Sequence, residues 1–373
     1  MRMIKLLQNL CIVTILALAS TQAWAGSEPA HIDRPEVGVY YFDGWADPTE
    51  HNFHMNGLAG QFANREPLSG WYDNSDKIVH QQIVWARKAD INFFVFDWYD
   101  TSRDGNLSDQ TLNSALHRFV HDRRKLGMKY ALLYVNNGAF SIPPDKWQGQ
   151  CDAWVHQYFV DKNYERVSGK PLLVVFSAGD MEKAWKDGPG VKSAWNTLQE
   201  TAKRAGLPGV YVACCALPGP QYGWTDIAHL ATEGYSGFTG YNYPGMSGTV
   251  KGGNPYSIIT QGSLTIFNSF AKRSKLPYIP VVMTGWDPRP WKETDFWYRR
   301  SPAQVAALLT STLDWWIANP NVRPSAHQPL ILMEAWNELG EGSYIVPNKG
   351  DGYSYVDAIA RALTNWSTLH CRR

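Results

Sequence analysis

The sequence has little charge and no excess of either sign: 18% of its 373 residues are charged, and 35 Lys and Arg face 34 Asp and Glu. It has no basic tail or charged block, which argues against a nucleic-acid partner because phosphate binding needs a concentrated basic face. Cysteine is scarce, with five residues, and neither a C-x-x-C pair nor a histidine group with metal-ligand spacing occurs. We therefore expect no metal and no other cofactor. A G-x-S-x-G nucleophile elbow is also missing, which removes one common hydrolase signature.

The N-terminal segment has the pattern of an export signal. Two basic residues precede the apolar run Leu6–Ala19, and Ala23-Trp24-Ala25 forms a small-x-small cleavage site. The pattern predicts a signal peptide over residues 1–25 and a secreted or periplasmic mature chain over 26–373. An uncleaved anchor is the alternative, although the run is short for a bilayer span, which takes about 20 residues. No other run is long enough, so we expect no membrane span after cleavage. Oxidation could pair the cysteines of the mature chain, and the sequence does not choose the pairing. They are Cys151, Cys214, Cys215 and Cys371.

Short apolar runs alternate with helical patterns along the mature chain. The runs are apolar almost throughout, which is typical of parallel strands covered on both faces. Eight such units without a composition break predict a single α/β domain with the (β/α)8 TIM-barrel fold. A doubly wound open sheet is the rival, but no Gly-rich phosphate loop follows the first run. The predicted strands are Val37–Asp43, Ile91–Asp97, Tyr130–Asn136, Pro171–Ser177, Val210–Ala216, Tyr235–Tyr241, Tyr278–Thr284 and Pro329–Trp336.

Two of the helical patterns are clear enough to place. One helix should begin at Ser301-Pro302-Ala303-Gln304, where Ser can cap, Pro suits the first helical position and Gln can complete a capping box. It would bury Val305, Leu308 and Trp316 on one face. The second should bury Val356 and Leu363 near the C-terminus.

Aromatic residues are abundant, with 17 Trp, 19 Tyr and 14 Phe. They could form a Trp-rich core or flat faces on which sugar rings pack. Nearly every predicted strand ends with an aromatic beside an Asp, Asn or Glu. Because chemistry in this barrel sits at the C-terminal ends of the strands, this favours a carbohydrate cleft. The predicted substrate-binding residues are Tyr41, Asp43, Trp45, Asp97, Trp98, Tyr99, Asn136, Tyr241, Asn242, Tyr243, Trp286, Asp287, Arg289, Trp291, Trp336 and Asn337.

Two carboxylates follow the last predicted strand in the segment Asn337-Glu338-Leu339-Gly340-Glu341-Gly342. Hydrolysis of a glycosidic bond commonly uses two carboxyl groups, one that protonates the leaving oxygen and one that acts as base or nucleophile. The two glycines would let the backbone turn tightly and bring both side chains to one cavity. A solvated acidic turn is the alternative. We predict that Glu338 and Glu341 are the catalytic residues.

The chain resembles the glycoside hydrolase family 99-like group, which includes the bacterial WbsX-like proteins. The segments that carry the resemblance are Val37–Phe42, Phe94–Tyr99, Gly240–Pro244, Gly285–Pro290 and Ala335–Gly342. The resemblance implies a (β/α)8 barrel and retaining hydrolysis of α-linked sugars, with mannosides cleaved internally by the characterised enzymes. It also implies that Glu338 takes the proton of the sugar 2-hydroxyl, whose oxygen then attacks the anomeric carbon. Glu341 would protonate the leaving group and later activate water.

One departure from the family pattern bears on the substrate. The characterised mannosidases carry an aromatic residue and a His between the two Glu, where this chain has Leu339 and Gly340. This version is similar to the WbsX-like branch, so the mechanism can transfer without the mannose preference. We expect an exported glycoside hydrolase that acts as a monomer on a carbohydrate substrate. The rivals are a non-catalytic carbohydrate-binding protein and a glycosyltransferase of polysaccharide biosynthesis.

Overall fold

A computed structural model describes residues 31–46, 55, 57–102, 112–217, 227–291 and 294–371. The predicted signal peptide over residues 1–25 lies outside this part of the chain. Residues 32–373 form one compact unit, as expected for a single domain. Within the described ranges no helix combines the length and the apolarity needed to cross a bilayer. Cys151, Cys214, Cys215 and Cys371 are all free thiols.

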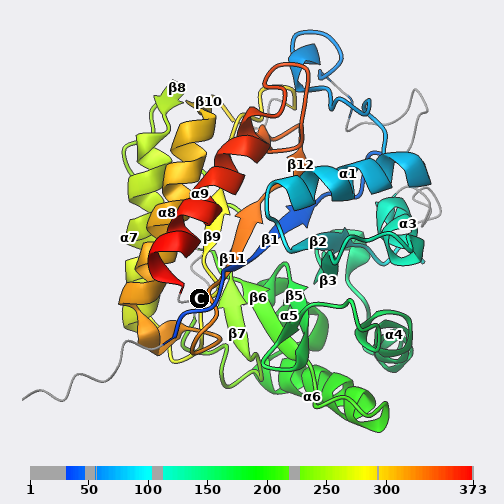
Figure 1. Ribbon diagram of the computed structural model, residues 1–373. Coiled ribbons are helices and arrows are strands. Elements are labelled where there is room, and N and C mark those ends of the chain that lie inside the picture. Colours follow the sequence, from blue (N-terminus) through cyan, green and yellow to red (C-terminus); the bar gives the residue numbers. More distant parts are fainter. Residues whose placement is uncertain are drawn as a thin grey trace, which may run out of the picture. The chain divides into compact units, whose positions relative to one another are not determined.

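Parallel strands form the barrel at the centre of this unit (Figure 1). Their order around the sheet is β7-β6-β5-β3-β2-β1-β11-β9, so the first and last strands of the barrel, β1 and β11, are neighbours. The ring closes between β7 and β9 through a parallel bridge from Phe238 to Tyr278, with the amide of Ile279 donating to the carbonyl of Phe238 at 2.9 Å. The strands are β1 Glu36–Tyr41, β2 Phe93–Trp98, β3 Lys129–Tyr134, β5 Lys170–Val175, β6 Tyr211–Cys215, β7 Gly237–Thr239, β9 Val281–Met283 and β11 Leu330–Glu334.

Each barrel strand overlaps one of the eight predicted runs, so the predicted TIM barrel is confirmed. Most predicted runs extend a residue or two beyond the strand, because the polar residues that follow leave the ladder and turn over the end of the barrel. Short strand pairs lie outside the ring. They are β4 Arg166–Val167 beside β5, β8 Gly252–Pro255 with β10 Phe296–Arg299, and β12 Asn337–Glu338 with β13 Ser343–Tyr344.

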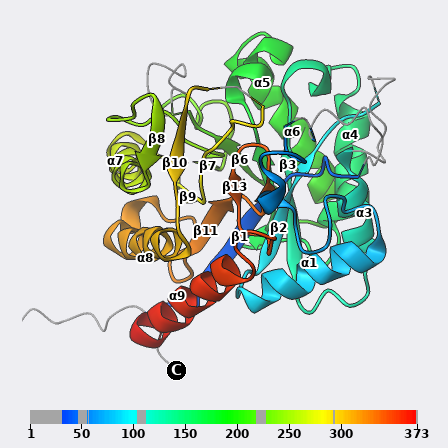
Figure 2. The ribbon, with the colours of Figure 1, turned by 90° about the horizontal axis from the view of Figure 1, so that it is seen from above.

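Helices surround the barrel when it is viewed from above (Figure 2). The predicted helix start at Ser301 is confirmed: its hydroxyl accepts the amide proton of Gln304, Pro302 is the first helical residue, and Val305 faces the core. The helices are not shared evenly, since α5 and α6 both follow β5 and the described part of the β6–β7 connection holds none. The α-helices are α1 Asp76–Lys88, α3 Ser114–His121, α4 Trp147–Trp154, α5 Ala178–Trp185, α6 Gly188–Arg204, α7 Ser257–Arg273, α8 Pro302–Ala318 and α9 Ser354–His370.

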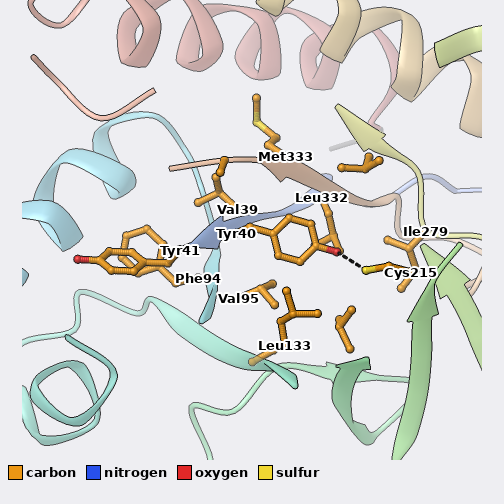
Figure 3. Packing of buried hydrophobic residues seen from close by; sticks show 14 of the residues in the cluster. Val39, Tyr40, Tyr41, Phe94, Val95, Leu133, Cys215, Ile279, Leu332 and Met333 are labelled. Carbon is orange, nitrogen blue, oxygen red and sulfur yellow. Dashed lines mark hydrogen bonds between the residues drawn. The ribbon is translucent and has the colours of Figure 1, made fainter. Parts of the chain in front are cut away.

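Successive side chains of each strand point alternately into the barrel and out toward the helices. Figure 3 shows this on β1, where Tyr40 points across the interior to Cys215 and Tyr41 points the opposite way, beside Phe94. The strand side chains that point inward are buried, so the described part of the interior is a packed core. The same alternation continues to the ends of the strands, where it decides which polar residues reach the candidate site.

Candidate active site

The segment after β11 folds back over the barrel as a small hairpin. Its stem pairs β12 with β13, and the side chain of Asn337 exchanges two hydrogen bonds with the backbone of Phe42, after β1, at 2.8 and 2.9 Å. Its tip turns through Gly342, which has a φ of +73° that favours glycine. Gly340 faces the indole of Trp291 so closely that a Cβ there would lie 2.0 Å from the ring. Both glycines of the acidic segment are therefore needed for the hairpin to form against its surroundings.

The hydroxyl of Tyr241 contacts the carboxyl groups of both Glu338 and Asp97. The hydroxyl of Tyr241 lies 2.8 Å from Oε1 of Glu338 and 3.1 Å from Oδ2 of Asp97. A phenol has one proton, so it can donate to only one of two carboxylates. The second contact requires a proton on a carboxyl group. Burial raises the pKa of the Asp97 carboxyl well above its ordinary value, outweighing the lowering effect of the Tyr241 hydrogen bond, and the charge of Glu341 raises it further. We therefore assign that proton to Asp97, which donates to Tyr241 while Tyr241 donates to Glu338.

Glu341 is in a different environment, although it lies in the same hairpin. It is half-buried, and its Oε2 accepts a hydrogen bond from the side-chain amide of Asn242 at 3.0 Å. Glu338, in contrast, is only 5% exposed. Two carboxyl groups held in unlike surroundings are suited to different protonation states and so to different roles.

A further carboxyl group lies beneath the hairpin at the end of β11. Glu334 has no exposed surface, and burial raises the pKa of its carboxyl well above the ordinary value. The charges of Glu341 and then of Glu338 raise this pKa further. The end of the barrel therefore gathers four acidic side chains that interact electrostatically: Asp97, Glu334, Glu338 and Glu341.

Charged residues from neighbouring loops hold the tip of the hairpin. Asp287, in the loop after β9, donates its backbone amide to the carbonyl of Glu341 at 2.5 Å. Its carboxylate accepts from Arg65 at 2.6 Å and from the guanidinium of Arg289 through both oxygens at 2.6 and 2.7 Å. Arg65 also donates to the carbonyl of Leu339 at 2.7 Å. The backbone that carries Glu341 is thus held by the three-residue charge cluster of Asp287, Arg65 and Arg289.

Comparison with known proteins identifies the family. The profile of the family described as Glycosyltransferase WbsX matches residues 142–359, which is more than half of the chain. The chain belongs to the WbsX family. A stretch of 87 residues is 36% identical to the uncharacterized protein WxcX of Xanthomonas campestris pv. campestris (strain B100). That match covers 23% of this chain and only 12% of WxcX.

Solved structures with similar folds support a glycoside hydrolase-like barrel for this WbsX-family chain. The glycoside hydrolase family 99 endo-α-mannosidase of Bacteroides thetaiotaomicron superposes with a TM-score of 0.60 over 89% of this chain and 98% of its own, at 15% identity. A glycoside hydrolase-like protein superposes with a TM-score of 0.59 over 91% of this chain and 97% of its own, also at 15% identity. At this identity the likeness shows the fold, and it agrees with the resemblance to the family 99-like group.

Several predicted site residues of the WbsX-family chain lie at or beside the carboxyl cluster. Asp97, Tyr241 and Asn242 contact each other or the two Glu directly. Tyr99 is buried, and burial raises the pKa of its phenol. The charges of Asp97 and Glu338 raise this pKa further, so Tyr99 lies close enough to interact with both. Asp287, Arg289 and Trp291 pack around the hairpin tip.

Other residues predicted to bind substrate are buried and form hydrogen bonds within the scaffold. Tyr41 points out of the barrel and donates to Asp73 at 2.7 Å. Asp43 accepts two backbone amides of the first turn of α3, at 3.0 and 2.9 Å. Asn136 exchanges two hydrogen bonds with the backbone of Ser177 after β5. All three side chains are buried. Tyr41 points away from the barrel interior because side chains alternate along the strand. The polar atoms of Asp43 and Asn136 bond backbone groups.

The aromatic candidates divide in the same way. Trp336 has no exposed surface and donates its indole N–H to Gln82 of α1 at 2.8 Å, so it packs between barrel and helix. Trp45 is buried and donates to the carbonyl of Asn337 at 3.0 Å. The remaining buried members are Trp98, which packs on Trp154, Tyr243, which bonds Tyr278, and Trp286, whose carbonyl accepts from Tyr298. These aromatics belong to the Trp-rich core, whereas the half-buried Trp291 lies beside the hairpin.

Residues that sequence reasoning missed complete the surroundings. Glu334 was visible as an acid at the end of the last strand but had no assigned role. Arg65 ends the short 3-10 helix Ala63–Arg65 and Arg300 directly follows β10, and the fold brings both to the hairpin. No group of three or more His, Cys, Asp or Glu within the described ranges has the arrangement of a metal site.

Proposed function

We propose that this protein is an exported glycoside hydrolase that cleaves α-linked glycans with retention of anomeric configuration. Glu341 acts as general acid and then general base, and Glu338 acts as the base for the sugar 2-hydroxyl. The name of the similar Bacteroides protein suggests internal cleavage of a mannose-type glycan as the first activity to test. Export rests on the signal pattern of residues 1–25.

The proposed reaction proceeds in two balanced steps. In the first, Glu338 accepts the 2-hydroxyl proton, O2 attacks the anomeric carbon to form a 1,2-anhydro sugar, and Glu341 donates its proton to the departing glycosidic oxygen. In the second, Glu341 takes a proton from water, the water oxygen attacks the anomeric carbon, the C1–O2 bond breaks, and Glu338 returns its proton to O2. Two inversions give net retention, and both carboxyl groups end as they began.

The observation that carries the proposal is the contrast between the two carboxyl groups. Glu338 is buried and accepts a hydrogen bond from the Tyr241 hydroxyl. Glu341 is half-buried and lies against an amide. It is thus more open to a leaving group and to water.

The test is release of reducing ends from α-mannans, α-glucans and bacterial O-antigen polysaccharides by the native sequence and three variants. Glu341→Gln and Glu338→Gln should each lower kcat by about 10²- to 10⁴-fold, the usual contribution of a general acid or base. Glu200→Gln makes the same chemical change on the exposed face of α6 and should leave the rate unchanged. Proton NMR of the first-formed product should show the substrate's α configuration. Equal rates in all variants, or an inverted product, would contradict the proposal.

A glycosyltransferase is the second candidate, because the matching family profile carries that description. A transferase must bind a nucleotide sugar, so calorimetric titration with UDP- and GDP-sugars separates the two. Saturable nucleotide-sugar binding without polysaccharide cleavage favours transfer. Glycan binding with neither cleavage nor nucleotide-sugar binding favours a carbohydrate-binding protein.

A further inference from the structure

A cavity of about 290 Å³ lies outside the carboxyl cluster, against the hairpin tip. Its charged lining is unbalanced, because Arg65, Arg289 and Arg300 contribute three positive charges and Asp287 contributes one negative charge. Gly342 and Tyr344 of the hairpin form one wall. In a chain with nearly equal numbers of acidic and basic residues, a net charge of two in so small a volume is a local feature that needs a reason.

Asp287, the one acid among the described residues that line the cavity, is already fully engaged. Both oxygens of Asp287 accept hydrogen bonds from Arg289, and one of them also accepts from Arg65. The side chain of Arg65 is 5% exposed, and burial lowers the pKa of its guanidinium from the ordinary value. A buried guanidinium nevertheless stays charged at neutral pH, so the field of these residues persists inside the cavity.

Arg300 supplies the excess charge and an unused donor. Its Nη1 donates to the carbonyls of Thr284, at 3.1 Å, and Tyr344, and its guanidinium lies 3.9 Å from the ring centre of Tyr344. Its Nη2 is buried and meets no acceptor among the described residues. A purely structural arginine would use both nitrogens, because a buried donor without a partner costs free energy. The charge of Asp351 also acts on Arg300, but Asp351 does not line the cavity.

We propose that this cavity binds an anionic substituent of the substrate, a carboxylate or sulfate group on a sugar unit close to the cleaved bond. The net positive charge of the lining attracts such a group, and guanidinium N–H groups form strong, charge-assisted hydrogen bonds to anionic oxygens. The unit lies close to the reacting bond because Gly342 lines the cavity and follows Glu341 directly. That the anion belongs to a glycan rests on the function proposed above, whereas the anion site itself does not.

Calorimetric titration of the purified full chain with three monosaccharides tests the site. D-glucuronate carries a carboxylate, glucose 6-sulfate carries a sulfate, and D-glucose is the neutral reference, all at one fixed ionic strength. At least one anionic sugar should bind about tenfold or more tightly than glucose, and the two arms identify the preferred group. Arg289→Gln should weaken that binding about ten- to hundredfold, the usual effect of losing a charge-assisted hydrogen bond. Arg289 is suited to this change because its side chain is 37% exposed.

Arg299→Gln is the matched control. Arg299 is the exposed last residue of β10, directly before Arg300, and it does not line the cavity. This variant should bind the anionic sugar as the native sequence does. The proposal is overturned if neither anionic sugar binds better than glucose, or if both variants weaken binding equally. Failure of the hydrolase proposal looks different: no polysaccharide would be cleaved, while glucuronate or the sulfate would still bind to both the native chain and Glu341→Gln.

Discussion

Replacing Asp97 by Asn tests whether this residue carries a proton in the folded protein. The change keeps the shape of the side chain, and the amide of Asn can donate to Tyr241 as the protonated carboxyl does. Burial and the charge of Glu341 hold the pKa of Asp97 well above its ordinary value. The folded state therefore keeps a proton that the unfolded chain releases above about pH 4. Its contribution to stability is complete below that pH and is lost as the pH rises through the folded-state pKa.

The size of the effect follows from one proton. While Asp97 stays protonated in the fold, the native sequence loses about 1.4 kcal/mol of unfolding free energy per pH unit from this group alone. Asp97→Asn lacks this loss, so its stability relative to the native sequence should rise by about 1.4 kcal/mol per pH unit over the range in which Asp97 stays protonated in the fold. Urea unfolding followed by circular dichroism at pH 5, 6 and 7 measures it. Asp295→Asn, at an exposed site, is the control and should run parallel to the native sequence. Parallel curves for Asp97→Asn would refute the assignment of the proton.

Three further changes test other contacts. Tyr241→Phe removes the hydrogen bond to Glu338 and should lower kcat/KM about 10- to 100-fold, and unchanged kinetics would show that the phenol does not support the base. Asn136→Ala leaves buried backbone groups of Ser177 without partners and should lower the unfolding free energy by about 2–4 kcal/mol in urea titrations. A loss under about 0.5 kcal/mol, the size of a typical surface change, would contradict its scaffold role. Gly340→Ala should displace Trp291 and reduce kcat/KM at least about tenfold on the cleaved polysaccharide, whereas full activity would mean that this contact is dispensable.

The barrel could be predicted because its strands are buried on both faces. Such strands read as continuous apolar runs, and all eight appear at the predicted places. The last residues of the predicted runs are the exception. Asp43 and Asn136, for example, are polar residues whose side chains bond backbone groups of neighbouring elements after the strand has ended. The sequence alone does not show where the strand's hydrogen-bond ladder ends and these side-chain to backbone hydrogen bonds begin.

The candidate site could be predicted only in part, because the sequence does not show which of two adjacent residues at a strand end points toward the site. Alternation sends Asp97 into the barrel and its neighbour Trp98 outward onto Trp154, although the two are adjacent in sequence. Deciding between them requires the register of each strand against the core. Arg65 and Arg300 are a harder case, because their place beside the hairpin depends on the fold rather than on a local pattern.

The hairpin that carries Glu338 and Glu341 has a consequence for how this protein could diversify. Its stem is tied to β1 through Asn337, and its tip is tied to the loop after β9 through Asp287. The two carboxyl groups belong to one six-residue piece, so their mutual spacing is set within that piece. The surrounding loops can exchange residues and reshape what enters the cleft without separating the pair. Under the proposed function, changes in sugar preference can accumulate in the surrounding loops while the two carboxyl groups keep their geometry.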